Sequence, residues 1–156
     1  MGRIEKSIEI GAPPEKVWEM LALDRHKEWD EEMEKSLESL EYTSEVHSLE
    51  DKYKVGASAR VNMKGMGMGE VDFEITESLE NEKMTIHVKK SGTNQTAGIM
   101  TFILEPVKKR TRITCVFDYK MPWGIFGKFL EKLFGRRMEE KHLEKCLEKL
   151  KNILEK

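Results

Sequence analysis

Two residues near the end of the chain have the spacing of a metal-binding pair. His142 and Cys146 are four positions apart in a segment with helical periodicity, so their side chains share one helix face. A structural zinc site needs four ligands and a catalytic site needs three. His26, His47 and His87 are isolated in the sequence and supply no further pair. We therefore interpret His142 as a surface histidine beside a buried thiol and expect no metal site.

A second group of polar residues could perform acid–base chemistry. Asp24, His26 and Asp30 bring two carboxylates and an imidazole into one short segment, and such side chains are typical general acids and bases. The charged rim of a short helix explains them equally well, and we favour that interpretation because spacing alone does not supply catalytic geometry. The motifs Gly-x-Ser-x-Gly and His-Glu-x-x-His are missing from the sequence, so neither a nucleophile elbow nor a zinc-protease helix is predicted.

A glycine-rich segment at residues 65–69, Gly-Met-Gly-Met-Gly, superficially resembles a phosphate-binding loop. Such a loop must be followed by a helix whose amides face the phosphate, but the alternating residues Val71–Ile75 follow here. We therefore predict a hairpin turn. Both flanking strands carry apolar residues at odd positions, so the turn must hold an odd number of residues, three or five. Gly67 is the residue expected at a position with positive φ.

Length and composition set limits on the whole chain. The 156 residues suit a single domain, and the balance of 38% apolar and 36% charged residues indicates a folded, water-soluble protein. A net charge of −2, from 27 basic and 29 acidic residues, argues against a nucleic-acid partner. Apolar runs are too short for a membrane-spanning segment or a signal peptide. Two cysteines favour a cytoplasmic location, and the abundance of Glu and Lys is typical of a thermophile.

The apolar pattern predicts the elements that must position these residues. Arg3–Ile10 alternates as a strand, and two short helices follow, over Glu15–Leu23 and from Asp24 through Met33. Asp24 is the expected cap of the second helix. Between Leu37 and Tyr119 the period is two, with turn signals at short intervals, which indicates antiparallel hairpins.

The period returns to 3.6 after Pro122. Residues Trp123–Glu155 would extend about 50 Å as one straight helix, so we expect a bend near Gly127 or Gly135. Its apolar stripe must cover the concave face of the curved sheet.

This order of elements resembles the START-like superfamily, also called SRPBCC or helix-grip. The similarity lies in IEKSIEIGAPPEKVWEML (Ile4–Leu21), Trp29, KVGASARV (Lys54–Val61) and the closing segment Tyr119–Glu155. Within the superfamily the chain is most similar to the polyketide cyclase/dehydrase and lipid-transport families. The resemblance implies an α+β helix-grip fold over residues 1–156 as one START-like domain. About seven antiparallel strands would wrap around a long C-terminal helix, with two short helices after the first strand.

The resemblance also implies an apolar cavity between the sheet and the last helix. Three connections would surround its mouth: residues 65–69, 91–96 and 121–127. The ten methionines could simply fill an irregular core, or they could line an adaptable cavity and its mouth. We expect Trp18 and Trp29 to close one end of the sheet and not to line the ligand path. The residues expected to bind a ligand are Met63, Met66, Met68, Phe73, Met84, Met100, Phe102, Phe117, Tyr119, Trp123, Phe126 and Leu130.

Three functions agree with such a cavity. The first is binding or transport of a small apolar ligand, such as a lipid, an isoprenoid or a polyketide-like compound, without a cofactor. The second is a cyclase or dehydratase, in which Tyr119, the clearest inward hydrogen-bonding group, would be the catalytic candidate. The third is a protein-interaction module of the chaperone-activator type. We favour binding, because the inward residues are nearly all apolar and general acid–base catalysis needs titratable groups.

Overall fold

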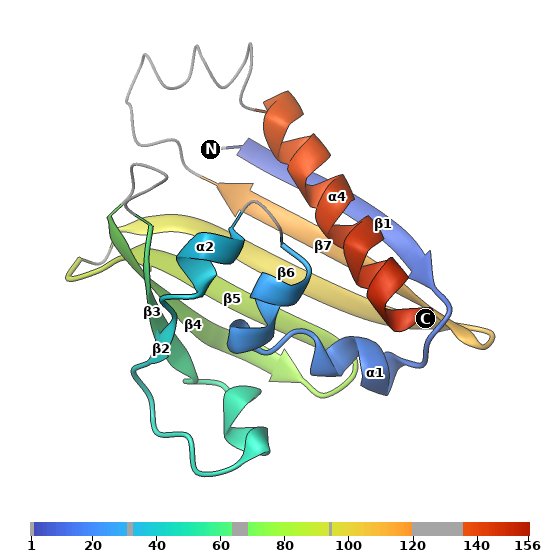
Figure 1. Ribbon diagram of the computed structural model, residues 1–156, viewed down its shortest axis with the longest axis horizontal. Helices are drawn as coiled ribbons and strands as arrows, with labels where there is room; N and C mark the ends of the chain where they lie inside the picture. The colour runs from blue at the N-terminus through green and yellow to red at the C-terminus, as the bar shows by residue number, and fades with distance from the viewer. Residues whose placement is uncertain (1, 31–32, 64–68, 94, 120–135) are drawn as a thin grey trace.

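The computed structural model describes residues 2–30, 33–63, 69–93, 95–119 and 136–156. A strand comes first, short helices and further strands follow, and a helix ends the chain (Figure 1). The elements are β1 (Gly2–Ile10), α1 (Pro14–Glu19), η1 (Leu23–Glu28), α2 (Glu34–Leu37), β2 (Glu41–Tyr42), η2 (Leu49–Lys52), β3 (Ser58–Asn62), β4 (Glu70–Leu79), β5 (Lys83–Lys90), β6 (Thr96–Val107), β7 (Arg110–Tyr119) and α4 (Arg136–Leu154). Among the described helices, none is long and apolar enough to span a membrane.

The strands form one antiparallel sheet of seven in the order β1-β7-β6-β5-β4-β3-β2. The first strand pairs with the last, β7, from Gly2 opposite Tyr119 to Ile10 opposite Thr111. The ladder is irregular after Ile75 in β4 and after Val88 in β5, and irregularities of this kind bend and twist a sheet. The α+β fold with a curved, open sheet agrees with the helix-grip architecture expected from the sequence.

Side chains of β4 alternate between the two faces of the sheet. Three inward residues that the sequence predicted to be buried are at most 5% exposed: Val71, Phe73 and Ile75. Asp72, on the other face, is half-buried and accepts hydrogen bonds from Arg60 Nε at 2.9 Å and Ser91 Oγ at 2.8 Å. The predicted register is therefore confirmed. Of the outer residues that the alternation predicts to be exposed, Glu70 is exposed, whereas Asp72 and Glu74 are half-buried on a face with cross-strand polar contacts.

The same register settles the length of the turn between β3 and β4. Asn62 is opposite Glu70, and the Met63 amide donates a hydrogen bond to the Gly69 carbonyl at 2.6 Å. Residues 64–68 remain between them, an odd number, as the alternation requires. Gly69 has a φ of 69°, a left-handed conformation that glycine adopts without strain. Gly67, for which the sequence predicted such a conformation, lies outside the described residues.

Helix α4 lies across one face of the sheet beside β1 (Figure 1). Its apolar stripe is buried there, with Cys146 4% exposed, Leu147 2% and Leu150 0%. At the sheet edge Lys6 Nζ lies 2.9 Å from Glu144 Oε1, and the Gly11 amide donates a hydrogen bond to a carboxylate near the end of the chain. The predicted helix start at Trp123 and the bend near Gly127 or Gly135 fall outside the described residues.

The segment after β1 differs in detail from the expected pair of short helices. Helix α1 begins at Pro14, as the fixed φ of proline favours. The second expected helix is instead a 3-10 turn, η1, followed by the separate helix α2. Asp24 does not cap it: the residue before η1 is Ala22, and Asp24 Oδ2 lies 2.6 Å from Lys52 Nζ. The Asp24 carboxylate, which the sequence predicted to cap a helix, therefore pairs with Lys52 instead.

Two neighbouring residues of β4 test the register directly. Ile75→Ala should lower the free energy of unfolding by about 2–5 kcal/mol, because it leaves a cavity where a fully buried side chain stood. Glu74→Ala, on the other face, should change it by no more than about 0.5 kcal/mol. Urea unfolding followed by circular dichroism measures both. Similar losses in the two variants would contradict the alternation.

Candidate functional site

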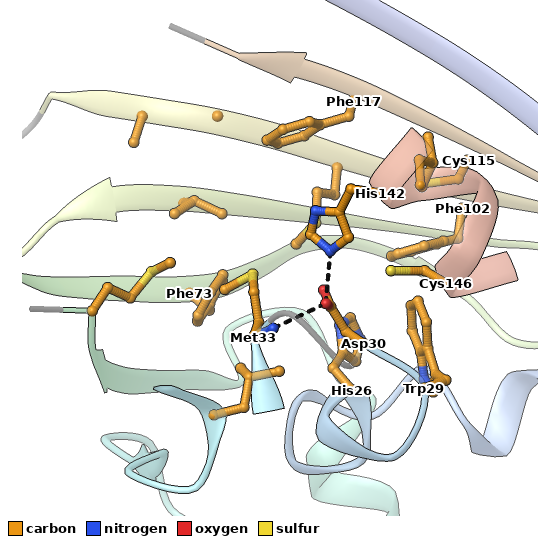
Figure 2. A pocket seen from close by; sticks show the side chains of 17 residues that line it. His26, Trp29, Asp30, Met33, Phe73, Phe102, Cys115, Phe117, His142 and Cys146 are labelled. Carbon is orange, nitrogen blue, oxygen red and sulfur yellow. Dashed lines mark hydrogen bonds and ion pairs between the residues drawn. The ribbon is translucent and has the colours of Figure 1, made fainter. Parts of the chain in front are cut away.

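A cavity of about 170 Å³ lies between the sheet, α4 and the segment from η1 to α2 (Figure 2). Strands β4 to β7 supply most of its apolar wall. Polar groups enter from α4 and from the segment around η1. The lining residues are His26, Trp29, Asp30, Met33, Leu37, Met63, Phe73, Val88, Ala97, Gly98, Met100, Phe102, Cys115, Phe117, His142, Leu143 and Cys146.

Several residues expected to bind a ligand meet at this cavity, namely Met63, Phe73, Met100, Phe102 and Phe117. Met84 is buried but does not line it, because the cavity lies near the other end of β5, where Val88 is the lining residue. The remaining expected residues lie outside the described part of the chain, and their roles stay predictions: Met66, Met68, Trp123, Phe126, Leu130 and the side chain of Tyr119.

One wall of the cavity depends on a glycine in β6. A Cβ atom on Gly98 would lie 2.8 Å from Cε2 of Phe117 and 3.2 Å from the carbonyl oxygen of Asp118. Glycine therefore allows the Phe117 ring to pack directly against β6, as aromatic rings do over glycines in antiparallel sheets. The Phe117 ring therefore forms part of the cavity wall beside β6.

A close, partly buried contact between Asp30 and His142 connects the two sides of the cavity. His142 Nε2, on α4, lies 2.7 Å from Asp30 Oδ1, and the two side chains are 15% and 14% exposed. The same Asp30 oxygen accepts a hydrogen bond from the Met33 amide at 3.2 Å, which orients the carboxylate (Figure 2). The interpretation of His142 as a surface histidine is therefore wrong, because α4 turns this face towards the cavity.

Cys146 joins the Asp30–His142 pair. It lies one helical turn after His142 and is 4% exposed. The ligating atoms of Asp30, His142 and Cys146 all lie within 4.8 Å of one another. In Figure 2 the imidazole and the sulfur come from α4 and the carboxylate comes from the facing segment. The three residues place nitrogen, sulfur and oxygen donors together at one side of an otherwise apolar cavity.

His26 is a separate, fully enclosed imidazole in the cavity wall. Its Nε2 lies 3.0 Å from the Leu21 carbonyl oxygen, and its ring centroid is 4.7 Å from that of Trp29 and 5.8 Å from that of Phe102. Burial lowers the pKa of His26, since desolvation penalises the imidazolium more than the Leu21 carbonyl and the nearby carboxylates favour it. The residue is therefore a neutral, aromatic part of the wall near neutral pH.

Comparison with known proteins identifies the family of this chain and finds solved structures with the same fold. The family described as polyketide cyclase/dehydrase and lipid transport matches residues 1–155. The chain belongs to this family. It thereby belongs to the START-like superfamily that the order of strands and helices suggested. A comparison with the sequences of curated proteins found no match.

Solved structures similar to this family member share its fold at low sequence identity. The Aha1 dimer from Colwellia psychrerythraea is 20% identical with a TM-score of 0.64, and the match covers 99% of this chain and 97% of that one. A protein from Thermus thermophilus is 21% identical with a TM-score of 0.63, covering 97% and 95%. A protein of the dynemicin biosynthetic locus is 15% identical with a TM-score of 0.60, covering 98% and 47%.

Trp29 has a different place in this family member from the one expected. It is 3% exposed, and its indole Nε1 donates a hydrogen bond to the Met20 carbonyl at 2.9 Å. Its ring also lines the cavity, edge-on to Phe102 at 6.0 Å. The expectation that Trp29 lies away from the ligand path is wrong, because η1 folds back over the sheet. Trp18 does not line the cavity; it stacks on Tyr53 at 6.0 Å.

Cys115 is the second thiol in the cavity wall and has a different character. It lies on β7, is 2% exposed, and burial raises the pKa of its thiol to about 12. A thiol with such a pKa stays protonated at neutral pH and is a poor nucleophile or metal ligand. Cys115 is therefore an apolar wall residue.

Part of the polar side of the cavity was visible in the sequence. His142 falls on the same helical stripe as Leu143, Cys146, Leu147 and Leu150, and this stripe indicates that its side chain faces inwards. No comparable local signal pairs His142 with Asp30, which is 112 residues away in the chain.

Titration of His26 should appear in the stability of the protein. Its pKa in the folded state lies below 6.5, the value of an unperturbed histidine, so below about pH 6.5 the unfolded state binds the extra proton first. The contribution of His26 to the free energy of unfolding is complete above about pH 6.5. It decreases by about 1.4 kcal/mol per pH unit as the pH falls from about 6.5 to the lowered pKa of the folded state. Urea unfolding at about pH 7.5 and about pH 5.5 measures this loss.

Two variants separate His26 from other titrating groups. His26→Gln has no imidazole at this position, so its free energy of unfolding should change less between the two pH values than that of the parent protein. His47→Gln is the control, since the His47 side chain is 80% exposed and should leave the parent's dependence unchanged. An unchanged slope in His26→Gln would contradict the assignment.

Proposed function

We propose that this protein binds a compact, mostly apolar small molecule that carries one polar group. The observation that carries the proposal is an apolar cavity with a partly buried, hydrogen-bonded pair, Asp30–His142, at one side. Membership of a family described by polyketide cyclases, dehydrases and lipid transport supports a small organic ligand. Cavities with apolar walls and a few convergent polar groups are the usual form of such binding sites.

The volume of the cavity favours a ring over a long acyl chain. It measures about 170 Å³, and an engineered protein cavity of about 150 Å³ with apolar walls holds one benzene molecule. The rings of Phe73, Phe102 and Phe117 in its wall suit an aromatic ligand. Among the lipid, isoprenoid and polyketide-like compounds expected from the sequence, a compact polyketide-like aromatic ring fits these dimensions.

The Asp30–His142 pair explains why the ligand would carry a polar group. A polar group that is shielded from water is costly unless it is hydrogen-bonded. Asp30 and His142 satisfy each other at 2.7 Å and still line the cavity. A hydroxyl or carbonyl group on the ligand would find its hydrogen-bonding partner there, and the rest of the ligand would contact apolar walls.

One observation favours a second candidate function, a cyclase or dehydratase in the same cavity. The Asp30 carboxylate orients the His142 imidazole, as carboxylates do in histidine-based acid–base catalysis. His142 would then move a proton on the bound ligand, with Tyr119 as the further catalytic residue proposed from the sequence. Turnover of a ring-forming substrate that is lost in His142→Gln, with ligand binding retained, would favour this function over binding alone.

A cavity-filling substitution tests the binding function. Met100→Trp places an indole in the cavity, so it should weaken binding of naphthol, a fluorescent two-ring phenol, at least tenfold, or about 1.4 kcal/mol. Ile99→Trp is the matched control, because the preceding residue of β6 points to the opposite face of the sheet. Fluorescence titration measures binding, and thermal melting shows that both variants are folded.

Other outcomes of this titration point elsewhere. Equal naphthol binding by the two variants would remove the cavity as the binding site. Saturable binding of a fluorescent fatty acid but not of naphthol would replace the ring-sized ligand by a lipid. Binding of neither compound by the parent protein would overturn the proposal and favour a protein partner.

A further inference from the structure

We infer that Asp30, His142 and Cys146 form a binding site for a divalent transition-metal ion, with zinc as the expected metal. The three side chains converge from two separate segments, and their ligating atoms all lie within 4.8 Å of one another. The sequence analysis noted the spacing of His142 and Cys146 but expected no metal site from it, because a third ligand, Asp30, comes from a distant segment. This site goes beyond the proposed ligand function and does not depend on it.

The donor set selects the metal. Cysteine sulfur, histidine nitrogen and carboxylate oxygen are the three ligand types that zinc accepts, and three protein ligands with one open position are typical of catalytic zinc sites. Magnesium and calcium prefer oxygen ligands alone. A mixed set with one soft sulfur and one imidazole therefore favours zinc, and cobalt(II) can replace zinc as a spectroscopic probe.

The charges of the site suit its apolar surroundings. With the Cys146 thiol deprotonated, the ligands carry two negative charges, from thiolate and carboxylate, beside a neutral imidazole. A doubly positive metal ion makes the complex neutral, which avoids the large cost of enclosing an uncompensated charge. Binding therefore releases protons from the site to solvent, and affinity should fall as the pH falls.

The protein already holds the three ligands in place. His142 and Cys146 are one turn apart on α4, a spacing that puts both on one helix face. The Met33 amide donates a hydrogen bond to Asp30 Oδ1 and orients the carboxylate. The 2.7 Å contact between Asp30 and His142 shows that the two segments approach closely enough to share one ion. A bound metal would replace this contact and join the segment around η1 to α4.

The open coordination position would face the cavity. The lining residues around the three ligands include Met33, Phe102 and Leu143, so a fourth ligand from a bound small molecule would approach through an apolar space. The polar group proposed for that molecule would then meet the metal ion.

Cobalt(II) titration of the full chain tests the site without any organic ligand. Protein stripped of metal with a chelator should bind one cobalt ion per chain near neutral pH. It should then show the visible absorption of tetrahedral cobalt and a near-ultraviolet thiolate-to-cobalt band. Zinc should displace the cobalt and raise the melting temperature, because the metal binds the folded state.

Substitutions identify the ligands. Cys146→Ser should abolish the thiolate band, and Asp30→Asn or His142→Gln should weaken zinc binding at least tenfold. Cys115→Ser is the matched control, because Cys115 lines the same cavity outside the cluster and should leave the spectrum unchanged. Circular dichroism shows whether each variant is folded.

Two results would overturn the site: no cobalt or zinc binding by the parent protein at micromolar metal, or a thiolate band that survives in Cys146→Ser. If Cys146→Ser does not fold, the parent protein and Cys115→Ser decide alone. A thiolate-to-cobalt band in the parent protein and in Cys115→Ser supports the site. Loss of this band in Cys115→Ser contradicts the site. Naphthol binding is measured separately, so failure of the metal site and failure of the ligand proposal remain distinguishable.

Discussion

The structure depends on one constraint: a curved antiparallel sheet with its apolar side chains on one face must have that face covered. Val71, Phe73 and Ile75 show the alternation in β4, and Met84 and Ile86 continue it in β5. A slip of one residue would turn the whole set to solvent, so burial holds the register. Helix α4 and the segment from α1 to α2 are the cover, and their positions follow from the sheet beneath them (Figure 1).

The cavity arises where the two parts of this cover meet. Helix α4 brings His142 and Cys146 to the junction, and the segment around η1 brings Trp29 and Asp30. The sheet contributes mainly apolar groups below them, among them Phe102. Among the described lining residues, the polar side chains therefore come from the cover, and the sheet supplies apolar wall. Residues of the cover could therefore change the polar groups of the cavity while the sheet keeps the fold.

The titratable side chains in the cavity wall have unequal environments. His26 is kept neutral by burial, and its ring packs against Trp29 and Phe102 as an aromatic residue would. Asp30 and His142 instead form a close, partly buried pair, with His142 Nε2 2.7 Å from Asp30 Oδ1. The thiol of Cys115 lies on β7 outside the cluster, whereas Cys146 lies beside the pair. The two imidazoles of this cavity thus have different neighbours, and so have its two thiols.

The sequence by itself was sufficient to predict the succession of strands along the chain and the register of β4. It also predicted the odd number of residues in the turn after β3 and the burial of the apolar side of α4. Each of these follows from a local period of 2 or 3.6 residues combined with burial of one face. It was also sufficient to predict part of the apolar lining, such as Phe73 and Met100. Only the tertiary structure decided that Trp29 lines the cavity, that Met84 does not, and that Asp30 meets His142. Those facts depend on how a short, irregular segment crosses the sheet, and the contact joins residues 112 positions apart, beyond the range of any periodic pattern.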